Sequence, residues 1–217
     1  MTFSPLPSTI AAPVEHTLEI KRSVFLTHLA PVASMDEADE VIARIRKQRW
    51  DARHHCTALV VGTHADRQRS SDDGEPAGTA GVPMLEVLRR RGVTDVVAVV
   101  SRWFGGTKLG AGGLVRAYGN AVAETLDLAG IVRRTVRTRV LMDVPHAEAG
   151  RVLAFLHQWA DEHDAVLEPP LYGGRATLAA WVASADVALL DADVAALTAG
   201  AVTPRTGDIR VVDVPAR

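Results

Sequence analysis

The sequence predicts an α+β protein of two domains, and three observations support this fold class. Strand-like and helical periodicities alternate through the first part of the chain, where the run DVVAVVS fits a strand that is covered on both faces. The second part has the order strand, helix, strand, strand, helix, strand, which is typical of a ferredoxin-like unit. The basic segment IVRRTVRTRV separates these two patterns, so we place the domain boundary near Arg134.

The first domain is expected to begin after a loose arm. Residues 1–14 contain three prolines and no periodic pattern, which indicates a flexible N-terminal arm before a domain over 15–134. Apolar and polar residues alternate over 18–32, as in one long bent strand or a hairpin. Ser34 and Glu37 then have the spacing of a capping box, so a helix is expected to follow.

The rest of the first domain contains two strands, two helices and a long polar segment. The segment 63–81 is polar, contains glycine and lacks a period, and at this length a functional or mobile loop is expected. A helix that opens at Pro83 is expected to end near Gly92. The other expected elements are a strand over 54–62, a strand over 95–101 and a long helix over 112–129.

The second domain, expected over 135–217, follows the βαββαβ order. Two glycines between strand-like runs indicate a tight hairpin, and Gly200 is placed to end the last helix. The expected elements are a strand over 138–144, a helix over 146–160, strands over 164–172 and 175–183, a helix over 186–199 and a strand over 206–214.

Composition excludes several classes of protein. The chain has 217 residues, 47% of them hydrophobic and 23% charged, with a formal charge of -2, which is ordinary for a globular protein. No apolar run is long enough to span a bilayer, and the start lacks the pattern of a signal peptide. The only cysteine is Cys56, so no intrachain disulfide is expected. We therefore expect a cytoplasmic protein with no membrane partner.

A glycine-rich turn between the strand over 95–101 and the following helix is the first candidate site. Its glycines permit close backbone approach, and the helix start offers free N–H groups to an anion. The spacing matches neither a P-loop nor GxGxxG, and the alternative is a packing turn with Trp103 and Phe104 in the core. The candidate anion- or nucleic-acid-binding residues are Arg102, Lys108, Gly112, Gly113 and Arg116.

An acidic loop is the second candidate. Asp72, Asp73 and Glu75 are oxygen ligands of the kind that Mg²⁺ or Ca²⁺ prefers, although their spacing is too short for an EF-hand. Solvated turns often have the same composition. A third, intermediate alternative is an ion pair within the domain, in which a carboxylate accepts hydrogen bonds from Arg102 or Arg116 and holds the loop against the glycine-rich turn. We favour no metal.

The third candidate is the pair His54 and Cys56. Two residues apart on a strand, they leave the same face of the sheet, whereas His55 points the other way. They could serve as an acid, a base or ligands, but a closed zinc site needs two more ligands and a thiol nucleophile needs an orienting partner. Structural roles for both side chains are the simpler interpretation.

The run SDDGEPAGTAGVPMLEVL, followed by VVAVVSRWFGGTKLGAGGLVRAYGNA, resembles the signature of the IMPACT family, whose bacterial members are YigZ-like proteins. The resemblance covers about residues 18–130, and the βαββαβ part is similar to the second domain of bacterial members. It implies a first domain of the left-handed βαβ superfamily, shared with a ribosomal-protein domain and the GHMP kinases. It also implies a second domain like the last domain of elongation factor G.

The residues and the resemblance together lead to three functional hypotheses. The first is a non-enzymatic regulatory protein linked to translation, which binds RNA, the ribosome or a translation-related protein through the glycine-rich basic turn and needs no cofactor. The alternative is a Mg²⁺-dependent enzyme that acts on a phosphorylated small molecule or nucleotide, with Asp72, Asp73 and Glu75 holding the metal. The third is an interaction module that displays Trp103 and Phe104 to a protein partner.

Overall fold

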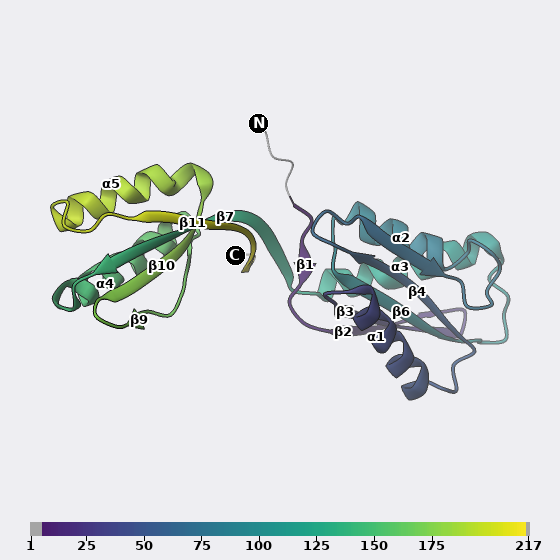
Figure 1. The fold of residues 1–217 in the computed structure, drawn as a ribbon. Coiled ribbons are helices and arrows are strands. Elements are labelled where there is room, and N and C mark those ends of the chain that lie inside the picture. The colour runs from purple at the N-terminus through teal and green to yellow at the C-terminus, as the bar shows by residue number, and fades with distance from the viewer. Residues whose placement is uncertain (1–5, 216–217) are drawn as a thin grey trace. The chain divides into compact units, whose positions relative to one another are not determined.

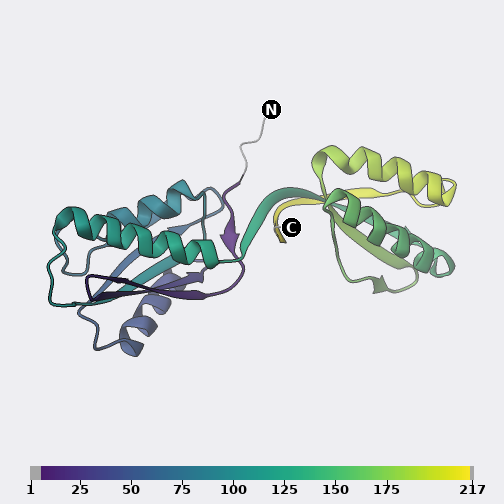
Figure 2. The ribbon, with the colours of Figure 1, turned by 180° about the vertical axis from the view of Figure 1, so that it is seen from behind.

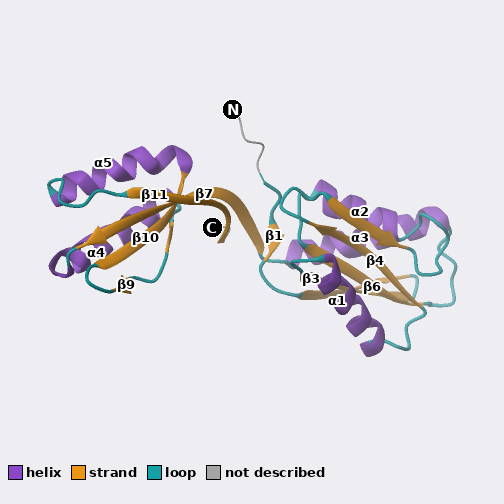
Figure 3. Cartoon of the chain, viewed as in Figure 1, coloured by secondary structure: helices purple, strands orange, loops and turns teal. Residues whose placement is uncertain are grey.

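The computed structural model describes residues 6–215 of the chain. They form a mixed α+β structure with five α-helices and two β-sheets. Figure 1 shows the chain coloured by residue number, and Figure 3 shows it coloured by secondary structure. The chain divides into two compact units: unit 1 is the described chain up to Arg133 together with Pro215, and unit 2 is Arg134–Val214. Unit 1 has an apolar core on each face of its sheet, and unit 2 has one apolar core of its own. Among the described residues, no helix combines the length and apolar character needed to cross a membrane.

Unit 1 is built on an antiparallel sheet of five strands with the order β2-β3-β6-β4-β5. Its strands are β2 (Val14–Ile20), β3 (Ser23–Pro31), β4 (His54–Val61), β5 (Arg67–Ser71) and β6 (Val96–Trp103). Helix α1 (Met35–Gln48) covers one face, and α2 (Gly81–Arg90) and α3 (Ala111–Leu128) cover the other, as Figure 2 shows from behind.

Strand β6 lies at the centre of this sheet because its side chains are apolar on both faces. Val97 and Val99 pack in the core under α1, whereas Val96, Ala98 and Val100 pack under α2 and α3. All five are fully buried. The prediction of a strand covered on both faces is therefore confirmed.

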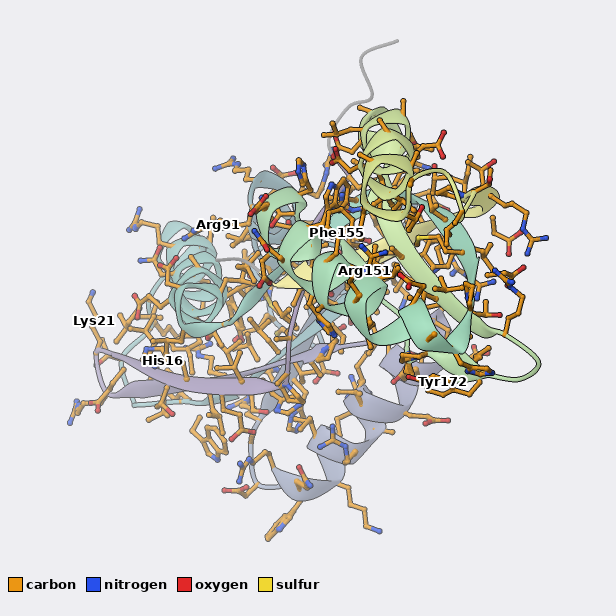
Figure 4. The ribbon with its side chains drawn as sticks, turned by 90° about the vertical axis from the view of Figure 1, so that its left-hand side faces the viewer. His16, Lys21, Arg91, Arg151, Phe155 and Tyr172 are labelled. Atoms are coloured by element: carbon orange, nitrogen blue, oxygen red, sulfur yellow. The ribbon has the colours of Figure 1, made fainter. Side chains whose placement is uncertain are left out.

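Local signals set the start of α1 and the turn before it. The Ser34 hydroxyl accepts a hydrogen bond of 3.1 Å from the Glu37 N–H, and the Glu37 carboxylate accepts one of 2.7 Å from the Ala33 N–H. Strands β2 and β3 form a hairpin, because Lys21 and Arg22 take positive φ values of 47° and 66° at the turn. Lys21 is labelled at the tip of this hairpin in Figure 4.

The structure adds two strands to unit 1 that the sequence pattern does not predict. Strand β5 lies within the segment 63–81, where a loop is expected; it is an exposed edge strand, so it has no apolar alternation. Strand β1 (Thr9–Ile10) lies within the predicted flexible arm and pairs with Ile131 and Val132, and Ile10 is buried. Residues 1–5 of that arm lie outside the described residues.

Unit 2 contains strands in the order β11-β7-β10-β8, with the short β9 beside β10. The elements are β7 (Ile131–Val144), α4 (His146–His163), β8 (Val166–Leu167), β9 (Leu171–Tyr172), β10 (Ala176–Ala183), a 3-10 turn (Ser184–Asp186), α5 (Val187–Thr198) and β11 (Arg205–Pro215). Both helices pack against β7 and β10 to form the core of unit 2. The basic segment expected to connect the domains is the first part of β7.

The strand expected over 164–172 is interrupted. After β8 the Glu168 N–H still donates to the Ala179 carbonyl, but Pro169 and Pro170 come next and neither has an N–H to donate to a ladder, so strand pairing resumes only at β9. The glycine pair that predicts a hairpin does connect β9 to β10, where the Gly173 N–H donates to the Arg175 carbonyl at 3.0 Å.

Candidate anion-binding site

A pocket of about 450 Å³ in unit 1 is lined by the start of β4, the acidic loop, the glycine-rich turn and the first turn of α3. The lining residues differ in exposure. Glu75, Arg102 and Leu114 are almost inaccessible and form the floor, while Arg53, Phe104 and Lys108 are exposed and form the rim. We call this cavity the basic pocket.

The floor is held by an ion pair. Arg102 Nη1 lies 2.5 Å from Glu75 Oε1, and the two side chains are only 7% and 4% exposed. The Tyr118 hydroxyl donates to the same oxygen at 2.8 Å, and burial raises the pKa of that phenol well above its usual value. The pair ties the acidic loop to β6 and α3, which is the acid-to-arginine tie that the sequence suggested.

Arg102 is further positioned by two residues of β3 and by Phe104. Its Nη2 lies 3.4 Å from the Ser23 hydroxyl, and its guanidinium lies 5.3 Å from the centre of the Phe25 ring and 5.8 Å from that of Phe104. Arg102 was expected to be an exposed cation that holds an anion directly. Instead its charge is compensated by Glu75 inside the unit, because β6 brings it between β3 and β4.

The other two carboxylates of the acidic loop are also engaged within the protein. Asp72 accepts hydrogen bonds from the N–H groups of Gly78, Ala80 and Gly81 at 2.8 to 3.0 Å, so it caps the start of α2. Burial alone would raise its pKa, but these backbone hydrogen bonds outweigh burial and leave the pKa below its usual value.

Asp73 has different hydrogen-bond partners from Asp72. Its Oδ1 lies 2.7 Å from Arg46 Nη2, and its Oδ2 accepts from the His55 N–H at 2.6 Å. The three carboxylates of the acidic loop therefore point to three separate partners, and no cluster of acidic, His or Cys side chains among the described residues is arranged to hold a metal ion. This geometry does not fit the ligand set of the Mg²⁺ hypothesis.

His54 and Cys56 both face the acidic loop. His54 Nδ1 lies 2.8 Å from the carbonyl oxygen of Asp73, so Nδ1 carries the proton, and the Cys56 thiol donates to the carbonyl of Asp72 at 3.0 Å. Burial raises the pKa of Cys56 to about 12, which keeps the thiol protonated and inert as a nucleophile. His54 lines the basic pocket, whereas Cys56 does not.

On the opposite face, His55 Nδ1 lies 2.9 Å from the Ser101 hydroxyl. Burial lowers the pKa of His55, so this side chain is neutral near pH 7.

The rim carries the uncompensated positive charge. Arg53 and Lys108 are exposed, and neither side chain forms an ion pair within the part of the chain that the structure describes. Gly110, with a φ of 72°, precedes the first turn of α3, and no side chain caps that helix start. The backbone N–H groups there add partial positive charge to the rim.

The glycine-rich turn reaches the pocket because it packs closely on the β2–β3 hairpin. A Cβ atom at Gly105 would lie 2.0 Å from the carbonyl carbon of Arg22, so only glycine fits there. The turn then presents Phe104, which is 47% exposed and lines the rim. Trp103 is instead half-buried and donates to Asp51 Oδ2 at 2.9 Å.

The structure brings together part of the predicted site. Lys108, Arg102, Glu75 and His54 line the basic pocket, whereas Asp72, Asp73, Cys56, Gly112, Gly113 and Arg116 do not. Arg53 and the exposed Phe104 were not predicted as parts of this site. A signal for Arg53 is its position immediately before His54, but the pairing of His54 with Arg102 across β4 and β6 is needed to place it.

The fold and the pocket define a two-unit α+β protein with a cationic cavity in its first unit. Residues 21–126 match the family model of the Impact N-terminal domain. The chain is 50% identical over 141 residues to IMPACT family member YvyE of Bacillus subtilis, a match that covers 65% of this chain and 63% of that protein. It is 43% identical over 150 residues to IMPACT family member YigZ of Escherichia coli, covering 68% and 74%. The chain belongs to the IMPACT family.

Two further matches extend this comparison. Protein IMPACT of Rattus norvegicus is 37% identical over 105 residues, which cover 45% of this chain and 32% of the rat protein. A crystal structure described as that of a hypothetical protein has 35% sequence identity and a TM-score of 0.59, covering 95% of this chain and 99% of the other.

Proposed function

We propose that this chain is a regulatory protein linked to translation that binds RNA, free or in the ribosome, through the basic pocket of unit 1. Its membership of the IMPACT family supports the regulatory role. The observation that carries RNA binding is the composition of the pocket rim, where Arg53, Lys108 and the uncapped start of α3 stand beside the exposed ring of Phe104.

This combination suits single-stranded RNA better than other anions. Cations track the phosphates of a strand, and an exposed aromatic ring offers a stacking surface to an unpaired base. A paired base is not free to enter a pocket. An acidic protein segment would pair with the cations, but its carboxylates would gain nothing from the ring. The rim therefore favours RNA over the protein partner that the sequence left open.

The charge of the two parts of the chain supports RNA binding by the first part rather than the second. Residues 135–217 carry 7 basic and 11 acidic residues, so this part repels a polyanion, whereas residues 1–134 carry 17 basic and 15 acidic residues. We expect RNA affinity of unit 1 to depend on a few cations at the rim rather than on bulk charge.

The strand topology also supports the two fold assignments that the family resemblance implies, a left-handed βαβ domain for unit 1 and a ferredoxin-like domain for unit 2. In unit 2, β10 is antiparallel to both of its neighbours in the order β11-β7-β10-β8, as a ferredoxin-like unit related to the last domain of elongation factor G requires. In unit 1, α1 connects β3 to β4 across the intervening β6, as the crossover of a left-handed βαβ domain would. The hand of that crossover is part of the proposal.

The test is the salt dependence of RNA binding by the full chain. A short labelled oligoribonucleotide of mixed sequence is titrated by fluorescence anisotropy at several salt concentrations. We expect the logarithm of the affinity to fall linearly with the logarithm of salt, and Arg53→Ala and Lys108→Ala each to reduce the slope by about 0.7 for one lost phosphate contact.

Arg67→Ala is the matched control for these variants. Arg67 is also exposed, but it pairs with Val61 at the far end of β4 from His54, so its removal should leave the slope unchanged. An affinity that does not change with salt, or an equal loss of slope in all three variants, would refute binding at the pocket.

A further inference from the structure

The floor of the basic pocket contains hydrogen-bonding groups that the protein does not use. Both hydrogen bonds to the Glu75 carboxylate end on Oε1, and Oε2 receives none from the described residues. In the same floor, Arg102 Nε is buried without a partner. A buried polar group without a partner costs free energy unless a ligand or water satisfies it. Arg102 Nε is the atom to which this cost applies, and Glu75 Oε2 is a second group of the floor, with acceptor capacity for the N–H donor of a ligand.

The pocket lining also has an apolar part that extends from floor to rim. It consists of Leu114 in the floor, the half-buried Leu109 and the exposed ring of Phe104 at the rim, and these side chains suit a flat, largely apolar group. The order from inside to outside is then a hydrogen-bond acceptor, apolar walls and a ring, and finally two cations with a helix start. A nucleotide has the complementary order, with N–H donors on the base edge, a flat ring system and a phosphate at the other end.

We propose that the basic pocket holds one unpaired nucleotide, with its base inserted against Phe104 and its phosphate at the rim between Arg53 and Lys108. The base donates an N–H to Glu75 Oε2. The cavity of about 450 Å³ lies within the range of small-ligand sites. This assignment rests on the proposed function for the source of the nucleotide, which is an RNA strand, but the pocket would accept a free nucleoside monophosphate in the same way.

The test compares ligands that share the phosphate and differ in the base. Adenosine 5′-monophosphate, ribose 5-phosphate and inorganic phosphate are titrated into the full chain at constant salt, with affinities from protein-observed NMR and ligand contacts from saturation-transfer NMR of the ligand protons. We expect the nucleotide to bind more tightly than ribose 5-phosphate, and saturation transfer from the protein to be stronger to the base protons than to the ribose. Ribose 5-phosphate or phosphate binding as tightly as the nucleotide would overturn the proposal.

Phe104 provides the second arm. Phe104→Ala should weaken nucleotide binding at least about fivefold, the lower range for loss of one base–aromatic stack, and leave ribose 5-phosphate binding unchanged. Phe104→Tyr should restore binding because it keeps the ring. Leu128→Ala, another exposed apolar residue at the far end of α3, is the matched control and should have no effect. Equal nucleotide affinity in Phe104→Ala and the unaltered chain would also overturn the proposal.

A short oligoribonucleotide identifies the source of the nucleotide. If it binds more tightly than the mononucleotide and competes with it, the ligand is an RNA strand and both proposals are supported. If the mononucleotide shows the expected dependence on base and Phe104 but the oligonucleotide binds no more tightly, the pocket assignment stands and RNA binding fails. If the oligonucleotide binds with the expected salt dependence but the base adds nothing, RNA binding stands and the pocket assignment fails.

Discussion

Glu75 is the residue on which the geometry of the pocket floor depends. Its carboxylate receives Arg102 from β6 and Tyr118 from α3, so one side chain joins three segments of unit 1. The pair is almost fully buried. Such a pair is a weak source of net stability compared with apolar residues of the same shape, but the loss of one partner leaves a buried charge without compensation.

Removal of that carboxylate should therefore destabilise unit 1 strongly. We expect Glu75→Ala to cost about 3–5 kcal/mol, because the Arg102 charge remains buried. Glu75→Gln should cost less, since its amide oxygen still accepts a hydrogen bond. The measurement is the rate at which a disulfide reagent labels Cys56, the only cysteine. Its thiol is buried, so it reacts only after unit 1 opens.

Even at the lower end of this range of free energies, Glu75→Ala should raise the rate of Cys56 labelling by at least about a hundredfold where opening is reversible and fast. Arg67→Ala, which removes an exposed charge from β5, should leave the rate unchanged. Labelling of Glu75→Ala at the rate of the unaltered chain would mean that Arg102 does not need its partner.

The sequence predicted the neighbourhood of the site better than the role of each residue. Glu75 of the acidic loop, Lys108 and His54 do line the same pocket. They lie at or near the ends of β5, β6 and β4, which are neighbours in one sheet. The burial of Arg102 was not predictable, since nothing in the run SRWFGG distinguishes a rim cation from a floor cation. Its role follows from long-range pairing, which places Arg102 opposite Phe25 on one side and His54 on the other.

At the scale of elements, helix α2 depends on a residue outside itself. Its own N-cap position is Ala80, which has no side-chain hydrogen bond to offer, and Asp72 from the preceding loop accepts three backbone N–H groups instead. A loop that folds back in this way fixes both the helix start and the acidic loop that lines the pocket.

The cap should make part of the stability of unit 1 dependent on pH. The folded-state pKa of Asp72 lies below its ordinary value, so its contribution is present above the ordinary aspartate range and is lost as pH falls through the lowered pKa. Asp72→Ala should cost about 1 kcal/mol near neutral pH, the usual value of an N-cap. Urea unfolding followed by circular dichroism should show this difference shrinking towards acid pH; a difference that stays constant would contradict the cap.

Elements with a strong period were predicted well, and exposed or very short elements were not. α1 and α3 each have an apolar stripe on one face, and β6 is an unbroken apolar run, so their sequences indicate how they are buried. β5 has the sequence RQRSS and is held by backbone pairing with β4, so its side chains give no signal. β1 has two residues, and its pairing partner lies more than 100 residues further along the chain.

At the scale of the whole molecule, the two units have cores without shared residues. The core of unit 2 consists of side chains from β7, α4, β10 and α5 and of Val202, whereas both cores of unit 1 use residues before Arg134. A change in one core should therefore alter that unit's packing energy and leave the other core intact.

Leu178→Ala tests this independence. Leu178 is a fully buried residue of β10 in the core of unit 2, and its truncation should cost about 2–5 kcal/mol by leaving a cavity. Thermal unfolding followed by circular dichroism should then begin at a lower temperature, while Cys56 labelling in unit 1 keeps the rate of the unaltered chain. Leu88→Ala, the corresponding truncation under α2 in unit 1, should do the reverse and accelerate Cys56 labelling. Faster Cys56 labelling in Leu178→Ala would mean that the two cores unfold as one cooperative unit, in spite of their separate side chains.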